Sequence, residues 1–510
     1  MKQIRHYLAA AIGLFLLLTW LAVAQGPQQQ QAPEPLFAAD PRILAEVKDN
    51  NELMTNLEYL TDMIGPRLTG TKQMTQASNW TMEMFKKYGL SNAHIEPWTI
   101  ARAWYRGTAS GRIVSPVERP LTLASAGWSP STPGRLRGTV VYVGARNMDE
   151  LQQFKGKLKG AIIMLTQPGT LPPPYEAPRS PLLSPGPAGP TAAGPAANPQ
   201  AAGGQQQFAR DRDAFFKAEG VAAMLRDSDK DFGLLNMSGV GGRDYNIGPF
   251  PTAYLSPESY RLIARLMKRG PVEIELEMTN TFSDKPVEVY NTVAEIPGTE
   301  KPEEVVIIGG HLDSWDLGTG ATDNGTGSMA VLEAARALMK LDVKPKRTIR
   351  FILFSGEEQG LNGSRMYAEA HKADLSKVSA VLVHDTGTGR VLSIGMQGNY
   401  QAREVMDRIT APLRISTIGL SEVSLRSTRG TDHASFNDAG VPGFYCIQDP
   451  YNYRKTHHSQ SDTFEQASKD DLVQGAQVLA VWAYNVAQFP DMLPRRPVPA
   501  DQQRTDSGQE

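Results

Sequence analysis

The sequence predicts an α/β protein in which a mostly parallel sheet is sandwiched by helices and a small β-rich module is inserted. Three observations predict this fold class. From about residue 272, short β-branched apolar runs alternate with helical patterns, which is typical of a parallel sheet covered on both faces. Between about residues 120 and 272 the apolar runs are shorter and separated by loops. With 510 residues, the chain is also too long for one ordinary domain.

The first residues are typical of an export signal. Lys2 and Arg5 precede an apolar run over residues 8–21, and Ala-Val-Ala at 22–24 forms a small-residue cleavage site. An uncleaved membrane anchor is the alternative, because the run approaches the length that spans a bilayer. No later segment is apolar for as long. We therefore expect a signal peptide at 1–24, a secreted or periplasmic location and no stable membrane insertion after cleavage.

The charge balance and the cysteine content limit which binding partners the protein can have and which interactions can stabilise its fold. The 52 basic and 54 acidic residues are interspersed along the chain, which argues against a nucleic-acid partner. Cys446 is the only cysteine and lies in the apolar run VPGFYCI, so we expect a buried core thiol and no internal disulfide. Stability must then come from core burial, bound metal or oligomerisation, a homodimer among the options.

Before the inserted module the sequence predicts a polar linker and the first part of the main domain. The linker is Pro- and Gln-rich and has little reason to fold. The main domain begins with helix-period apolar patterns and continues with strand-like runs. The linker covers 25–39 and the first part of the domain 40–119, with helices over 40–64 and 71–89 and strands over 92–101 and 103–115.

The inserted module, over 120–272, is predicted from three short strands at 138–144, 159–165 and 220–226. It is interrupted at 171–207 by a segment biased to Pro, Ala and Gly. Such a composition cannot bury a core, so we expect a disordered surface loop there. A docking or wall-binding segment is the alternative interpretation.

The main domain resumes over 273–495, and 496–510 is a polar tail that we expect to be frayed. Strands and helices alternate in this part of the chain. Strands are predicted at 287–298, 303–310, 348–356, 378–387 and 441–447, and helices at 325–340, 360–372 and 470–489.

Residues of metal-binding type follow three of these strands. His311 follows the strand predicted at 303–310, and Glu357 and Glu358 follow the strand at 348–356. Asp385 follows the apolar run 378–384 of the next strand. Because ligands of open α/β sheets gather beyond the carboxyl ends of the strands, we expect these side chains to meet at one edge. Three such coincidences make unrelated polar residues a poor explanation.

Two of the aspartates in the stretch 304–327, which begins within the strand before His311, are candidate site residues. Asp313, two residues beyond His311, is suited to accept the ring N–H of a ligating imidazole. Asp323 opens a helix, where its carboxylate could bridge two cations or simply cap the helix. A His, an interposed Asp and a row of carboxylates are the ligand inventory for two Zn²⁺ ions that share one carboxylate, and they predict a hydrolase.

The adjacent residues Glu357 and Glu358 are predicted to have different roles at the metal site. Neighbouring residues in a turn cannot both point at one metal, so one should bind and the other face the water. We assign Glu357 as the general base and Glu358 as the ligand. Two zinc ions at such a site would lower the pKa of the water and stabilise a tetrahedral oxyanion.

The second imidazole should come from THHSQSDTF, where the residues alone do not choose between His457 and His458. His433, in GTDHASF, is a further candidate, for which substrate contact or hydrogen bonding is favoured over ligation. Arg426 and Arg429 could pair with a substrate carboxylate. Ordinary solvated arginines are the simpler interpretation of both.

Five segments closely resemble the co-catalytic zinc exopeptidases of the aminopeptidase and carboxypeptidase type. The resemblance covers about Asn291 to Arg495 and extends weakly to GPRLTGT near residue 65. It implies that the inserted module is a protease-associated domain. The five segments are HLDSWDLGTGATDNGTG, KPKRTIR, EEQG, GTDHASFNDAGVPG and HHSQSDTF.

The resemblance also implies residue roles. It makes Asp323 the bridge between the two zinc ions, Glu357 the base, Asp313 the carboxylate behind His311, and the Asp323–Asn324 peptide cis. It selects His458 rather than His457. The ligand pairs that it implies are His311 with Asp385 for one zinc and Glu358 with His458 for the other.

The predicted function is hydrolysis of short peptides or dipeptides, with carboxypeptidase or dipeptidase action favoured by the resemblance over aminopeptidase action. A non-catalytic receptor-like homologue is a second hypothesis, although a dead site has no reason to keep all these residues. A single-zinc acyltransferase such as a glutaminyl cyclase is a third, and the pattern of two imidazoles with a shared carboxylate argues against it.

Overall fold

The computed structural model describes residues 37–168, 199–415 and 418–496. The chain separates into two units, Met1–Ala39 and Asp40–Glu510, and the second contains the three sheets of the described residues. The predicted signal peptide, almost all of the linker and the predicted tail beyond residue 496 lie outside the described residues. Within the described residues, no helix is both long and apolar enough to cross a membrane.

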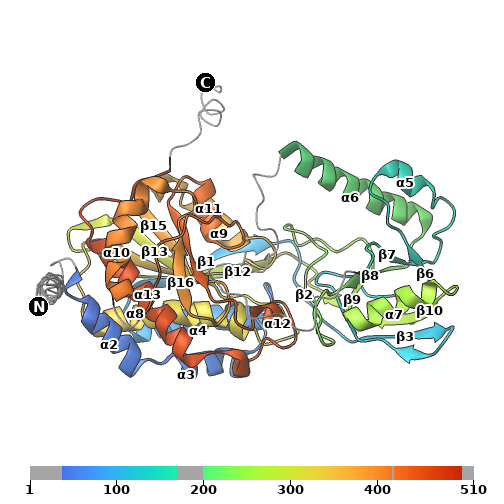
Figure 1. Ribbon diagram of the computed structural model, residues 1–510, viewed down its shortest axis with the longest axis horizontal. Helices are drawn as coiled ribbons and strands as arrows, with labels where there is room; N and C mark the ends of the chain where they lie inside the picture. The colour runs from blue at the N-terminus through green and yellow to red at the C-terminus, as the bar shows by residue number, and fades with distance from the viewer. Residues whose placement is uncertain (1–36, 169–198, 416–417, 497–510) are drawn as a thin grey trace, which may run out of the picture. The chain divides into compact units, whose positions relative to one another are not determined.

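The first sheet has seven strands and is parallel only at its centre (Figure 1). Its strands, in spatial order, are β1 (Ser91–Ile100), β12 (Val287–Ile296), β14 (Arg347–Phe354), β13 (Lys301–His311), β15 (Val378–Val383), β17 (Gly443–Gln448) and β16 (Val391–Gly395). Pairings from β14 through β13 and β15 to β17 are parallel, whereas the three outer pairings are antiparallel.

The sheet is therefore mixed, where the sequence predicted a mostly parallel one. The difference at β12 comes from the connection to β13, which spans only residues 297–300. Parallel strands need a crossover of a dozen or more residues, so this short connection makes β12 run opposite to β13. The apolar runs of the two strands look alike and do not reveal their directions.

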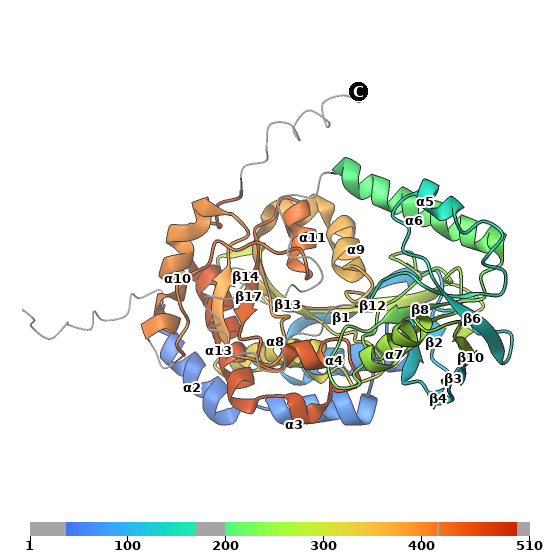
Figure 2. The same cartoon turned by 45° about the vertical axis from the view of Figure 1, so that its right-hand side comes forward.

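Helices cover both faces of the first sheet, as Figures 1 and 2 show. Helices α8 (Thr326–Lys340), α13 (Lys469–Gln488), α4 (Lys72–Lys87), α2 (Asp40–Asn50) and α3 (Leu53–Glu58) lie on one side, and α9 (Asn362–Ala370) and α11 (His433–Asp438) on the other. Residues Thr326–Leu338 of α8 are all buried, because this helix packs on β13 and β14 and is covered by α13, α2, α3 and α4. The remaining helical segments are Tyr59–Ile64, Ala321–Gly325, Lys372–Lys377, Tyr400–Ala402, α10 (Arg403–Ile415), α12 (Tyr453–Thr456) and Phe464–Gln466.

The inserted module contains a second sheet of eight strands. In spatial order these are β4 (Arg119–Pro120), β3 (Ala109–Ser115), β10 (Glu273–Met278), β6 (Leu136–Tyr142), β7 (Ile162–Met164), β8 (Ala223–Asp227), β9 (Thr252–Leu255) and β5 (Leu123–Ser125). Its helices are α5 (Met148–Gln152), α6 (Pro199–Glu219) and α7 (Pro257–Met267), and the short pair β2 (Trp104–Tyr105) and β11 (Thr281–Phe282) accompanies it. Buried Ile113, Val140, Ile162, Leu225 and Ile274 belong to its core.

Two predicted boundaries of the module are wrong. Strands β3 and β10 belong to the second sheet, because β10 pairs with both β3 and β6. The module thus begins before residue 120 and ends after residue 272. Residues 171–198 of the segment predicted as a disordered loop over 171–207 lie outside the described residues, and residues 199–207 belong to helix α6, which begins at Pro199. Ala and Gln favour helix, and proline is well suited to a first helical position.

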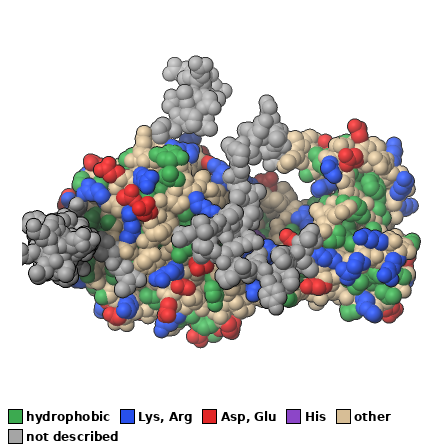
Figure 3. Space-filling view, viewed as in Figure 1, with side chains coloured by type: hydrophobic (Ala, Val, Ile, Leu, Met, Phe, Trp, Pro, Cys, Tyr) green, Lys and Arg blue, Asp and Glu red, His purple; other side chains and the backbone are tan. Residues whose placement is uncertain are grey.

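The described surface in view in Figure 3 carries interspersed basic and acidic side chains. On the second sheet, arginines pair with glutamates of β10: Arg112 with Glu275 at 2.9 Å and Arg137 with Glu273 at 2.6 Å. Cys446 is buried, as predicted, and its burial raises the pKa of the thiol well above its usual value.

Asp40 gives the main domain a pH-dependent stability. It is 2 % exposed, and burial raises the pKa of its carboxyl to about 7, although a 3.0 Å hydrogen bond from Asn485 opposes the shift. A raised carboxyl pKa disfavours the folded state once the unfolded chain ionises. This penalty is absent near pH 4 and grows until about pH 7.

We therefore expect Asp40→Asn to stabilise the protein at pH 8 by roughly 2–4 kcal/mol, and to have little effect near pH 4. Urea unfolding of the variant and the unchanged chain at both pH values measures this. An equal stability difference at both pH values would contradict the ionisation argument.

Candidate metal centre

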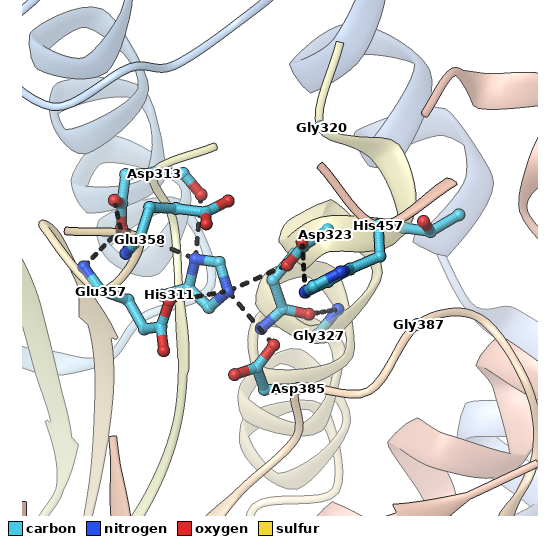
Figure 4. Close-up of polar contacts among 12 residues, drawn as sticks. His311, Asp313, Gly320, Asp323, Gly327, Glu357, Glu358, Asp385, Gly387 and His457 are labelled. Carbon is cyan, nitrogen blue, oxygen red and sulfur yellow. Dashed lines mark hydrogen bonds and ion pairs between the residues drawn. The ribbon is translucent and has the colours of Figure 1, made fainter. Parts of the chain in front are cut away.

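Strands β13, β14 and β15 bring the predicted residues to one edge of the first sheet. His311 is the last residue of β13 and lies opposite Phe354, the last residue of β14, in a parallel pairing. Glu357 and Glu358 follow β14, and Asp385 follows β15. Figure 4 shows His311, Asp323, Glu357 and Asp385 pointing toward one another, as the strand-end argument predicted.

His311 is the centre of the first group of donor atoms. Its Nε2 lies 3.1 Å from Asp385 Oδ1 and 3.3 Å from Asp323 Oδ1. One donor atom from each of these three residues lies within 4.8 Å of the other two. Glu357 Oε2 is farther from His311 Nε2, at 3.9 Å. The geometry therefore separates Glu357 from the three residues that could hold one cation.

The other oxygen of Asp323 faces a second group. Asp323 Oδ2 lies 3.5 Å from His458 Nε2 and 3.8 Å from His457 Nε2. His458 Nε2 is also 2.9 Å from Glu358 Oε2. The two imidazoles stack with their ring centres 3.7 Å apart. Asp323 thus presents one oxygen to each group, which is the arrangement that a shared ligand requires.

These donor atoms fit bound metal cations. Asp323 Oδ2 and Glu358 Oε1 are buried and have no hydrogen-bond partner, which is costly unless a cation satisfies them. Burial raises the pKa of Glu357 and Glu358 well above the usual value, so their charged forms need a positive charge nearby. Burial lowers the pKa of His458 to about 4, leaving the neutral imidazole that binds metal.

His311 and Asp323 stabilise each other's charged forms. Burial alone would lower the pKa of His311, but the carboxylates of Asp385 and Glu357 raise it well above its ordinary value. Burial likewise opposes ionisation of Asp323, yet its hydrogen bond with His311 lowers the carboxyl pKa. The concentration of carboxylates around one imidazole leaves excess negative charge at this edge of the sheet.

Asp462 holds the main chain that carries the shared carboxylate. Its Oδ1 accepts hydrogen bonds from Thr322 N at 2.6 Å and Thr322 Oγ1 at 2.9 Å, and its Oδ2 accepts one from Asp323 N at 3.1 Å. The Asp323–Asn324 peptide is cis, as the motif resemblance implied. The sequence alone does not single out Asp462, although it is the aspartate of the HHSQSDTF motif.

Asp313 lies behind His311, but its contacts differ from the prediction. The main-chain carbonyl of Asp313 is 2.9 Å from His311 Nδ1, whereas its carboxylate is 3.6 Å away. The carboxylate instead accepts hydrogen bonds from Thr69 Oγ1 at 2.9 Å and from the main-chain N–H groups of Glu357 and Glu358 at 3.2 and 3.4 Å. Asp313 therefore orients the glutamate turn as well as the histidine.

Arg67, in the GPRLTGT segment, is a positioning residue that the sequence did not single out. It is fully buried, and its guanidinium donates to the carbonyls of Leu312 at 2.7 Å, Thr319 at 2.8 Å and Gly320 at 2.7 Å. These carbonyls belong to the loop between His311 and Asp323. Arg67 thus fixes the connection between His311 and Asp323.

Asp432 is a second residue that the sequence did not single out. It is fully buried, and neither carboxylate oxygen has a hydrogen-bond partner. Burial raises the pKa of Asp432 to about 7, opposed by attraction to His311. The GTDH motif had drawn attention to the neighbouring His433 instead.

The hydrogen bonds of His433 and Arg429 are with other parts of the protein. His433 is fully buried, with Nε2 at 3.1 Å from the Thr428 carbonyl and its ring stacked on Tyr445. Arg429 forms an exposed ion pair with Asp438 at 2.8 and 2.5 Å. His433 is thus a packed core histidine and Arg429 a surface arginine, and the substrate contact of either stays a prediction.

Comparison with known proteins agrees with the motif resemblance. The model for peptidase family M28 matches residues 291–483. Carboxypeptidase Q of Mus musculus is 33 % identical over 456 residues, covering 88 % of both chains, and that of Homo sapiens is 31 % identical with the same coverage. A peptidase M28 precursor from Shewanella amazonensis has a TM-score of 0.72 at 27 % identity, covering 92 % of this chain and all of the other.

A zinc aminopeptidase from Bacillus subtilis shares the fold, with a TM-score of 0.61 at 19 % identity over 88 % of this chain and 97 % of the other. The α/β architecture, including the segments outside the family match, is therefore common to these proteins.

Proposed function

The chain belongs to peptidase family M28 and is a metallo-exopeptidase, and on this premise we propose that it is an exported two-zinc carboxypeptidase acting on short peptides, including dipeptides. The observation that carries the proposal is the position of Asp323, whose two oxygens face two separate groups of donor atoms. The second sheet would be a protease-associated domain, and the signal-like residues 1–24 support export.

We assign the ligands by the two groups around Asp323. His311 and Asp385 would hold one zinc ion, and Glu358 and His458 the other, with Asp323 shared. When bound, a zinc pair supplies Lewis acidity, which lowers the pKa of a water molecule and stabilises the negative charge that develops on the substrate carbonyl.

Glu357 would carry the protons of the reaction. Its carboxylate adjoins the donor cluster at 3.9 Å from His311 Nε2, and its main-chain N–H is anchored on Asp313. It takes a proton from the attacking water as the C–O bond forms. It then gives that proton to the amine nitrogen as the peptide C–N bond breaks, so the base is regenerated.

The preference for a carboxypeptidase rests on similarity to carboxypeptidase Q over most of both chains. An aminopeptidase could use the same metal chemistry, and the two differ in whether the substrate's free carboxylate or free ammonium is recognised. A non-catalytic homologue is disfavoured, because all five proposed ligands and Glu357 lie together.

We expect the purified protein to cleave dipeptides whose amine is blocked and to spare those whose carboxylate is blocked. A panel of dipeptides, free and blocked at either end, with and without a chelator, measures this. Chelation should abolish activity in every case. Cleavage only of substrates with a free amine would make the protein an aminopeptidase, and chelator-resistant cleavage would contradict the metal assignment.

A further inference from the structure

The inserted module touches the loop that carries the proposed zinc ligand His458. We call residues 454–462 the metal loop, since they contain His457, His458 and Asp462. We call residues 230–237 of the inserted module the docking segment. Direct hydrogen bonds join the two segments, which are more than 200 positions apart in the sequence.

Lys230 makes the central contact. Its side chain is buried, with the residue 7 % exposed. Its Nζ donates to the carbonyl of His457 at 2.6 Å and to that of Arg454 at 2.9 Å. Taking an ammonium group out of water is costly unless its hydrogen bonds are satisfied, and burial lowers the pKa of Lys230 to about 8. Here two main-chain carbonyls of the metal loop accept hydrogen bonds from the buried ammonium group and so stabilise its charge.

Other main-chain groups of the docking segment extend the contact. Met237 N donates to the carbonyl of His458 at 2.7 Å. Leu235 N donates to Gln460 Oε1 at 2.8 Å, and Gln460 Nε2 donates back to the carbonyl of Gly233 at 3.3 Å. The metal loop is therefore held at His457, His458 and Gln460.

The carbonyls of His457 and His458 belong to the two peptide groups that flank the Cα atom of His458. Lys230 fixes the first and Met237 fixes the second. His458 has a φ of 56°, in the left-handed region that a non-glycine residue keeps only when its surroundings hold it there. Fixing both flanking peptides sets the backbone angles of His458 and hence the direction of its side chain.

We propose that the inserted module is part of the machinery that positions the zinc ligands: Lys230 and Met237 hold His458 so that its imidazole meets Asp323 and Glu358. Lys230 is a positioning residue in this account and does not touch substrate or metal. The inference rests on the proposed zinc role of His458. In this account the inserted module helps to orient a zinc ligand, in addition to packing beside the metal centre.

The test compares Lys230→Met with Lys268→Met, which removes an exposed lysine of the same module. Zinc affinity is measured by competition with a chelator, without substrate, and the visible spectrum of the Co²⁺-loaded protein reports ligand geometry. We expect Lys230→Met to weaken binding of one zinc ion about 10–100-fold, to shift the Co²⁺ spectrum and to lower kcat with little change in KM. Lys268→Met should match the unchanged chain, and Lys230→Arg should restore most of the affinity.

Lys230→Met that binds both zinc ions as tightly as the unchanged chain would overturn the inference. If this variant does not fold, Gln460→Ala removes a neutral contact between the same segments, and zinc affinity equal to that of the unchanged chain would overturn it equally. The unchanged chain and His458→Ala are measured alongside. If the unchanged chain does not bind two zinc ions, the proposed function fails and the inference falls with it; if it does and Lys230→Met also does, only the inference fails.

Discussion

Replacing Glu357 by glutamine should lower kcat by roughly 10³-fold or more while both zinc ions stay bound. Glutamine keeps the size and the polarity of the side chain but cannot accept and return the proton. Glu357 lies farther from His311 Nε2 than either Asp385 or Asp323 does, so its loss should not release metal. The measurement is kcat on a cleaved dipeptide together with the zinc content of the purified variant.

Glu369→Gln is the matched control, because Glu369 is an exposed glutamate on α9 and its replacement should change neither quantity. Near-normal turnover by Glu357→Gln would remove Glu357 from the role of base. Loss of zinc from this variant would make Glu357 a ligand instead.

The second large effect is expected at the paired histidines. His458→Ala should lose one of the two zinc ions and with it most of the activity, whereas His457→Ala should keep both ions. The reason is geometric: His458 Nε2 lies 2.9 Å from Glu358 Oε2 and 3.5 Å from Asp323 Oδ2, while His457 Nε2 lies farther from the same Asp323 oxygen, at 3.8 Å. Zinc content by mass spectrometry and kcat of the two variants measure this.

Each histidine variant controls for the other, since both remove an imidazole from the same loop. Zinc loss from His457→Ala with retention in His458→Ala would exchange the two roles. Equal loss from both would indicate that the stacked pair acts as one structural unit rather than as a ligand and its neighbour.

Local sequence patterns were sufficient to predict that the donor residues follow neighbouring strands and therefore lie close together. A β-branched run ending in His311, another followed by Glu357 and Glu358, and a third followed by Asp385 are local signals. The carboxyl ends of β13, β14 and β15 meet because parallel neighbours share an edge. The choice of His458 over His457 came from the motif resemblance, since the two residues are chemically identical neighbours.

The groups that support these residues could not be predicted in the same way. Arg67 binds carbonyls about 250 positions away, and Lys230 binds the carbonyl of His457. Nothing local to either residue indicates its partner. Strand pairing has the same property. For this reason the residues of β3 and β10 were placed in the main domain, and the first sheet was expected to be more parallel than it is.

A zinc-edge anomalous diffraction map of the zinc-loaded protein tests the shared-ligand site most directly. The account predicts two peaks about 3.5–4 Å apart, with one oxygen of Asp323 bound to each. His311 and Asp385 should complete one site, and Glu358 and His458 the other. A single peak in fully active protein, or two peaks with Asp323 bound to only one of them, would contradict the two-zinc account.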